Sequence, residues 1–273
     1  MSKTNCKTAI QRLCRSAAVF SLLLAACSVD QGIEPLPGKL RVRVVYRGER
    51  PADTQGVYLV VAPEFPPHAI NELHHSPNSL AFDRDTVYAE LDLPYGHYDA
   101  YMLWWYSIDR KSNLADILSM SIDLTSKQPE YFDLTPDNPV YETRLTASWG
   151  AVNRNARIKG TVTFNGPFPA NTAAVAVAAY EVKPEDSIDY LIFLKSIDFS
   201  IETNPYQFDL PVTSGMVSYI AVFWLEERAA LTDFKTLGYY RDPRRPERIG
   251  QIFLSPGDIA SGVNIEADWS LIQ

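Results

Sequence analysis

The chain has 273 residues, of which 46% are hydrophobic and 12% aromatic, with 25 basic and 33 acidic side chains. This length allows either one large β domain or two domains of ordinary size. The formal net charge of −8 argues against nucleic acid or anionic lipid headgroups as partners, because both repel a negative surface.

The first 26 residues are typical of an export signal. They contain four basic residues, no acidic one, and an apolar stretch from Ala17 to Ala26. That stretch is too short to cross a bilayer as a helix, so it favours a secretory signal over a transmembrane anchor. Without the four basic residues, 21 basic side chains stand against 33 acidic ones, a formal net charge of −12.

The signal ends in Leu-Ala-Ala-Cys, at residues 24–27. This tetrapeptide closely resembles the lipobox of bacterial lipoprotein precursors. The resemblance implies removal of residues 1–26, lipidation of Cys27, and a lipid-anchored place in the bacterial cell envelope. Ser28 stands where many inner-membrane lipoproteins carry an acidic residue, so the resemblance favours the outer membrane. Cys6 and Cys14 would leave with the signal, so the mature chain would have no internal disulfide.

Residues 27–37 are expected to form a lipidated tether, because they contain Gly32, Pro35 and Pro37 and few large apolar side chains. After the tether the sequence repeats itself with a period of about 118 residues. Three blocks of identical residues keep their order in both copies. They pair Gly48, Pro51, Thr54 and Val57 with Gly166, Pro169, Thr172 and Val175; Asp92–Pro94, Gly96 and Trp105 with Asp209–Pro211, Gly215 and Trp224; and Leu134, Pro136, Ala147 and Trp149 with Leu254, Pro256, Ala267 and Trp269.

A period of this length indicates a duplicated domain, which places the first domain at residues 38–150 and the second at 156–273. Both copies read as short strands with alternating apolar residues, such as Val57-Leu59-Val61, separated by turns that contain Gly and Pro. The sequence therefore predicts an all-β chain with two tandem, internally duplicated antiparallel β-sandwich domains.

The segment Leu93-Pro94-Tyr95-Gly96-His97-Tyr98, followed by an apolar strand, resembles the transthyretin-like or carboxypeptidase-regulatory-like sandwich. Copy two is similar but has two extra residues and Val217 in place of the tyrosine. Members of such families are commonly non-catalytic domains of exported proteins, and some have a carbohydrate-binding-like fold. The resemblance therefore implies a binding domain and names no site residue.

The strand that follows this motif is apolar on both faces. One parity, with Tyr101, Leu103 and Trp105, is expected to face the core, and the other carries Tyr98, Trp104 and Tyr106. An outer face of this kind needs cover, either from a long loop after Pro63 or Lys183 or from the other copy. Alternatively, Tyr98, Trp104 and Tyr106 form an aromatic platform for a sugar ring or a partner protein.

All four histidines, His68, His74, His75 and His97, lie in copy one. Adjacent histidines on a strand point to opposite faces, and neither copy has a spaced ligand motif on a helix, so we expect no metal site. The sequence also lacks a nucleophile elbow, a phosphate-binding glycine loop and a metalloprotease helix motif, and we expect no cofactor and no catalytic residues.

These observations favour a lipid-anchored envelope protein with a non-catalytic binding or scaffolding role. Its partners would be the membrane, through the lipid, and an envelope protein or a glycan, but no nucleic acid. Two alternatives remain open. The first is a carbohydrate-binding module that uses the aromatic face of domain one, and the second is a hydrolase with an unrecognised site.

Overall fold

The structure is a computed structural model that describes residues 37–272, apart from 68–69, 111–113, 124–125, 187, 228 and 230–232. The expected export signal, the lipobox with Cys27, the tether as far as residue 36, and His68 lie outside the described residues. Among the described residues, no helix has both the length and the apolar character that crossing a membrane requires.

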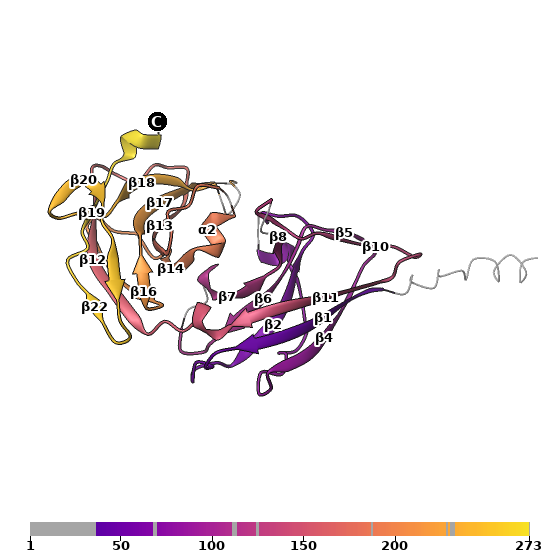
Figure 1. Cartoon of the computed structure of the whole chain (residues 1–273). Helices are drawn as coiled ribbons and strands as arrows, with labels where there is room; N and C mark the ends of the chain where they lie inside the picture. Colours follow the sequence, from indigo (N-terminus) through magenta and orange to yellow (C-terminus); the bar gives the residue numbers. More distant parts are fainter. Residues whose placement is uncertain are drawn as a thin grey trace, which may run out of the picture. The chain divides into compact units, whose positions relative to one another are not determined.

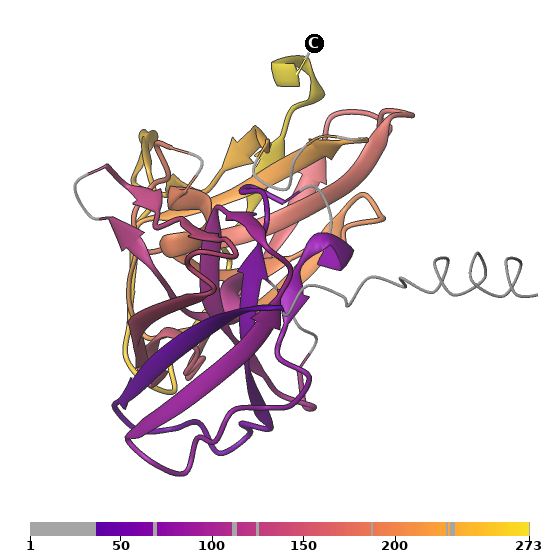
Figure 2. The same cartoon turned by 90° about the vertical axis from the view of Figure 1, so that its right-hand side faces the viewer.

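The first half of the chain folds into two main sheets, with strand orders β11-β1-β4 and β3-β2-β6-β7, and two short ladders, β5-β10 and β8-β9 (Figures 1 and 2). The strands are β1 (Gly38–Arg47), β2 (Gly56–Ala62), β3 (His74–His75), β4 (Thr86–Leu93), β5 (Gly96–Tyr98), β6 (Ala100–Tyr106), β7 (Ile117–Met120), β8 (Ile122–Asp123), β9 (Gln128–Pro129), β10 (Phe132–Leu134) and β11 (Val140–Ser148). Three 3₁₀ turns, η1 (Ile70–Glu72), η2 (Leu114–Asp116) and η3 (Trp149–Ala151), lie between or after them.

The second half repeats this arrangement, with main sheets β15-β12-β22 and β14-β13-β17-β18, β23 also paired to β12, and ladders β16-β21 and β19-β20. Its strands are β12 (Ala156–Phe164), β13 (Thr172–Tyr180), β14 (Leu194–Asp198), β15 (Tyr206–Val212), β16 (Gly215–Val217), β17 (Tyr219–Glu226), β18 (Lys235–Tyr239), β19 (Arg241–Asp242), β20 (Arg245–Ile249), β21 (Ile252–Leu254), β22 (Ile259–Ala260) and β23 (Ile265–Ala267). One short helix, α2 (Asp189–Ile192), precedes β14, and η4 (Trp269–Ile272) follows β23.

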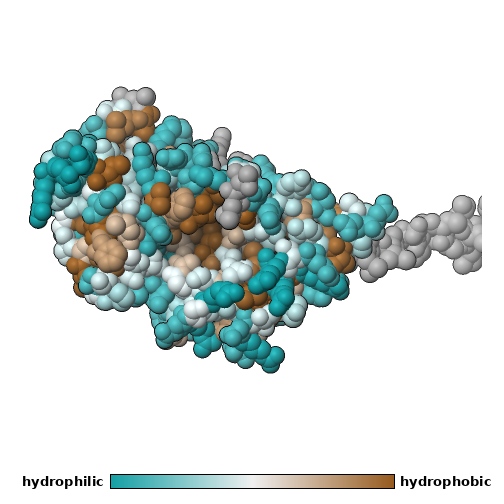
Figure 3. Space-filling view, viewed as in Figure 1, coloured by the Kyte–Doolittle hydropathy of each residue, from teal (hydrophilic) through white to brown (hydrophobic). Residues whose placement is uncertain are grey.

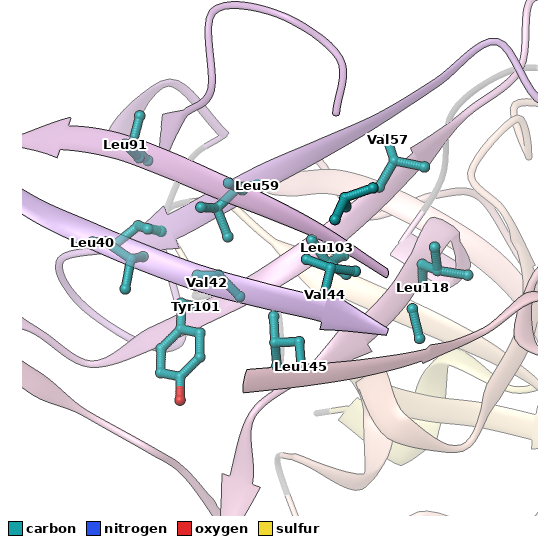
Figure 4. Close-up of a cluster of buried hydrophobic side chains, with 14 of the residues drawn as sticks. Leu40, Val42, Val44, Val57, Leu59, Leu91, Tyr101, Leu103, Leu118 and Leu145 are labelled. Carbon is teal, nitrogen blue, oxygen red and sulfur yellow. The ribbon is translucent and has the colours of Figure 1, made fainter. Parts of the chain in front are cut away.

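Each half has its own core between its two main sheets, which confirms the predicted all-β fold with two tandem, duplicated sandwiches. In β1, Leu40, Val42 and Val44 are buried and point toward the side chains of the facing sheet (Figure 4). The intervening Arg41 faces water and pairs with Glu90 at 2.9 Å. Alternation along the strand therefore separates the core face from the solvent face, as its period of two requires.

Strand direction differs in one respect from the purely antiparallel arrangement that we expected. The pairs β1-β11, β12-β22 and β12-β23 are parallel, whereas the other ladders are antiparallel. Parallel neighbours need a crossover connection. Each copy has one, because the chain passes through the second sheet and the short ladders before its last strand returns beside its first.

The duplication also includes a short hydrogen-bond relay, which occurs once in each sandwich. Trp105 Nε1 donates to Thr54 Oγ1 at 3.0 Å, and the Thr54 hydroxyl donates to the Pro51 carbonyl at 2.7 Å. In the second sandwich, Trp224 donates to Thr172 at 2.8 Å, and Thr172 donates to Pro169 at 2.7 Å. Both indole rings are buried, so each N–H needs an internal acceptor. The relay gives threonine and tryptophan the same role at these positions in both copies.

We predict that Thr54→Val lowers the free energy of unfolding by about 1–3 kcal/mol, because the Trp105 indole N–H then stays buried without an acceptor. Thr172→Val should have a similar effect in the second sandwich. Chemical denaturation followed by circular dichroism measures both changes. Thr163→Val, at an exposed position of β12, is the control and should change stability by less than about 0.5 kcal/mol. Equal effects of all three changes would contradict a role for the relay.

Candidate functional site

The sheet β3-β2-β6-β7 is apolar on the side that faces away from the core of the first sandwich. Pairing of β2 with β6 puts Tyr58 opposite Trp104 and Val60 opposite Met102, and β7 continues these rows with Ile117 and Met120. We call this surface the outer face. It consists of Tyr58, Val60, Ala62, Ala100, Met102, Trp104, Tyr106, Ile117 and Met120.

The chain covers one part of the outer face and leaves another part accessible. Phe65 and Leu73, in the segment after β2, pack against the cluster of Val60, Ala62, Ala100 and Met102, whose side chains are buried. Tyr58, Trp104, Ile117 and Met120 are half-buried, and Tyr106 is 38% exposed. The expectation that a loop after Pro63 covers this face is therefore confirmed for one part of it.

On the matching side of the second sandwich, the side chains of β13 and β17 are covered, whereas Thr236 and Tyr239 of β18 are half-buried. The covered side chains, Ala176, Ala178, Tyr180, Tyr219, Ala221 and Phe223, are each no more than 4% exposed. Tyr190 of α2 packs edge-on against Phe223, with ring centroids 5.7 Å apart, and Phe193 and Phe234 join the same cluster. Leu114 and Ala115 of η2 also belong to it, so the first half of the chain contributes to this cover.

The structure brings two of the three predicted platform residues together and separates the third. Trp104 and Tyr106 lie on the outer face, whereas Tyr98 is 3% exposed and belongs to the core of the first sandwich. The Tyr98 ring stacks on Phe132 at 5.0 Å, and its hydroxyl donates to the Pro94 carbonyl at 2.7 Å. The physical reason is that β5 and β6 are separate strands with Asp99 between them, so one alternation does not run through both.

Tyr58 is part of the outer face but was not among the residues predicted from the sequence. Its ring lies next to Gly56, which has no side chain of its own and stands opposite Tyr106 in the ladder. The signal was present in the sequence, because Tyr58 has the opposite parity to the core-facing row Val57-Leu59-Val61. What the sequence lacked was the register that sets Tyr58 against Trp104.

Beside the outer face, a groove of about 660 Å³ lies between β7 and the α2–β14 segment, and Figure 3 shows apolar side chains around this hollow. Lys195 lines it and is 7% exposed. Its ammonium group donates to the Thr213 carbonyl (3.3 Å), the Thr213 hydroxyl (2.9 Å) and the Ser214 carbonyl (3.2 Å). Burial lowers the Lys195 pKa. Because all three N–H groups already have acceptors, Lys195 holds the turn before β16.

The described histidines have different surroundings. The His74 ring lies edge-on to Tyr98, and His75 Nδ1 is 3.1 Å from the Ser76 carbonyl oxygen. His97 bridges two carboxylates, with Nδ1 2.8 Å from Asp133 Oδ1 and Nε2 2.9 Å from Asp99 Oδ1. The hydrogen bond to Asp133 is the main cause that raises the His97 pKa above 6.5. Among the residues that the structure describes, no group of three or more His, Cys, Asp or Glu side chains is placed to hold a metal ion.

No family model matches the chain, and no curated protein matches its sequence. Among solved structures, it is similar to a leucine-rich repeat protein from Bacteroides thetaiotaomicron, with a TM-score of 0.31, 9% identity, and coverage of 85% of this chain and 26% of that chain. It is also similar to a streptococcal ancillary pilin (TM-score 0.23, 9% identity, coverage 88% and 68%) and to a minor pilin from Streptococcus agalactiae (TM-score 0.24, 9% identity, coverage 84% and 95%). The chain thus spans about a quarter of the first protein. Because these TM-scores are below 0.5, the function is argued from this chain's own residues.

The partial exposure of Trp104 predicts how strongly acrylamide quenches the tryptophan fluorescence of the chain. Trp104 is half-buried, whereas the other four tryptophans are at most 7% exposed. Trp104→Phe should therefore remove most of the fluorescence that acrylamide quenches in the full chain. The control is Trp149→Phe, which removes a buried indole stacked on Tyr46. If Trp104→Phe leaves the quenching constant unchanged, the outer face is covered and is not available to a ligand.

Proposed function

We propose that the chain is a lipid-anchored cell-envelope protein with a non-catalytic role, and that it binds a partner protein through the accessible part of the outer face. The observation that carries this proposal is the difference between the two copies. The second sandwich buries the β13 and β17 side chains of its matching face under Tyr190, Phe193 and η2, whereas the first leaves Tyr58, Trp104, Tyr106 and Ile117 partly accessible. Contiguous apolar surface of this kind usually marks an interaction site.

The chemistry of the accessible side chains fits binding. Trp104 and Tyr58 are large aromatic residues that lie opposite each other on neighbouring strands, where rigid β-structure holds them. Tryptophan and tyrosine are the residue types that most often dominate the binding energy of protein interfaces, because they bury a large area with few rotatable bonds. Ile117, beside Trp104 on β7, extends the same surface with an aliphatic side chain.

A carbohydrate-binding role is the second candidate. It is favoured by the position of Trp104 and Tyr106, which lie two residues apart on the same face of β6, with Tyr106 at the more exposed end. Aromatic rings in such a row can stack against the apolar faces of sugar rings. The two candidate functions use the same side chains but differ in the ligand, which is a protein in the first and a glycan in the second. One set of variants therefore tests both.

We predict that Trp104→Ala reduces recovery of the partner at least tenfold in a crosslinked pull-down from native membranes, because it removes the central aromatic group of the surface. The matched control is Tyr88→Ala on β4, which removes a 79% exposed tyrosine from the other sheet. Retention on immobilised envelope polysaccharide, measured with the same variants, identifies a glycan ligand instead. Equal recovery of the wild type and Trp104→Ala in both assays would contradict binding through the outer face.

Anchoring through Cys27 is the second part of the proposal. It rests on the lipobox-like residues 24–27. The tether of about ten residues would reach at most roughly 35 Å when extended, so the first sandwich would work close to the membrane surface. The core side chains that the structure describes run from Leu40 to Trp269, and we propose that the two sandwiches fold without the anchor.

We therefore predict that Cys27→Ser releases the protein from the membrane fraction without changing its stability. Membrane fractionation measures the first effect and thermal unfolding the second. Cys14→Ser is the control, because its thiol lies within the expected signal and should leave the protein anchored. If the Cys27→Ser protein failed to fold, the separation between anchor and sandwiches would be wrong.

A further inference from the structure

His97 on β5 forms an ion bridge that joins two strands of the first sandwich. Its ring lies between Asp133 of β10 and Asp99, the residue that separates β5 from β6, at 2.8 and 2.9 Å. A carboxylate only accepts hydrogen bonds, and a neutral imidazole has a single N–H. Both contacts can be hydrogen bonds at the same time only when the ring carries protons on both nitrogens. The geometry therefore corresponds to the imidazolium form of His97.

The same Asp99 connects this bridge to the cover of the outer face. Its second carboxylate oxygen, Oδ2, accepts a hydrogen bond from the Phe65 backbone N–H at 2.9 Å. Its own backbone N–H donates to the Ala62 carbonyl at 3.0 Å. The Phe65 ring packs against the buried part of the outer face. A continuous series of contacts thus runs from Asp133 through His97 and Asp99 to Phe65.

The second sandwich shows that the fold does not require this bridge. Met216 and Phe253 stand opposite each other in the ladder β16-β21, at the positions of His97 and Asp133 in the ladder β5-β10. Both side chains are apolar, and the matching face of this sandwich is covered by aromatic packing around Tyr190. The second ladder thus has no counterpart of the His97 bridge at these two positions.

We propose that protonation of His97 sets how firmly Phe65 covers the outer face, so that the proposed binding surface is more closed at mildly acidic pH and opens as the pH rises. This inference rests on the proposed function, because it concerns the regulation of the same surface. Loss of the His97 proton leaves one aspartate without its donor. If Asp99 loses this donor, its carboxylate, which accepts the Phe65 N–H, is held less firmly. Phe65 then separates more often from Ala62 and Met102.

The charges around His97 set the direction of the effect. The groups that face its ring are Asp133, Asp99 and the ring of Tyr131, whose centroid is 5.3 Å away. The hydrogen bond to Asp133 is the largest cause and raises the His97 pKa; desolvation comes next and lowers it, and the charge of Asp133 and the hydrogen bond and charge of Asp99 raise it further. A raised pKa in the folded state means that the bridge stabilises the fold fully below about pH 6.5 and loses this effect as the pH rises through the folded value.

The His97 side chain is 52% exposed, so water screens the bridge and the effect should be modest. We expect the protection of the Phe65 amide against hydrogen exchange to fall about two- to fivefold between pH 5.5 and pH 8.5, after correction for intrinsic exchange, with the midpoint at the His97 pKa above 6.5. Titration of the His97 ring by NMR gives that pKa directly, in the full chain and without any partner.

His97→Gln should remove the fall in Phe65 amide protection with rising pH and keep that protection at its high-pH value throughout. The reason is that a neutral amide cannot replace the imidazolium between two carboxylates. Asp133→Asn should lower the His97 pKa and move the step to lower pH. The control His75→Gln changes a histidine outside the bridge and should keep the wild-type step. The inference is overturned if the wild-type His97 titrates at or below pH 6.5, or if Phe65 protection shows the same pH profile in wild type and His97→Gln.

These outcomes separate the inference from the proposed function. Phe65 exchange needs no ligand, so a step that His97→Gln abolishes supports the coupling even if Trp104→Ala leaves partner recovery unchanged. Conversely, loss of recovery with Trp104→Ala and a flat Phe65 profile would support the binding surface and refute its regulation by His97.

Discussion

A β-sheet with two apolar faces needs cover on both, because each square ångström of exposed apolar surface costs about 25 cal/mol. This constraint acts on the sheets β3-β2-β6-β7 and β14-β13-β17-β18. In each, one face belongs to the sandwich core and the other carries aromatic and aliphatic side chains. The helix α2 and the segment that contains Phe65 and Leu73 occupy the same place in the two copies, between the second and third strands, and both serve as cover.

The two copies meet the constraint in different ways. The second sandwich uses Tyr190 and Phe193, and it also takes Ala115 from η2 of the first half. Beside Ala115, Asp116 pairs with Arg154 at 2.7 Å, with side chains only 4% and 1% exposed. Removing one partner of such a pair leaves a buried charge, so the pair ties η2 to the segment before β12. The second sandwich thereby buries the outer side of β13 and β17, while the first leaves Trp104 and Tyr106 partly accessible.

Much of the fold was predictable from the sequence, because its signals are local. Alternation in Val57-Leu59-Val61 marks the core face of β2, and the repeated positions of Thr54 and Trp105 mark the duplication. The site was predictable only in part. Parity within one strand placed Trp104 and Tyr106 correctly on the outer face, whereas Tyr98 lies in the core because the alternation does not continue across Asp99 into a different strand.

The sequence by itself determined the all-β class, the duplication and the inner face of each sheet, since strand period and turn residues act over a few neighbouring positions. Only the tertiary structure decided which outer face stays accessible, because that depends on how far a covering segment reaches over a sheet. It also decided the bridge from Asp133 through His97 to Asp99 and Phe65. Phe65 and Asp133 are each more than thirty residues from Asp99, so they meet only after the strands have paired and fixed their register.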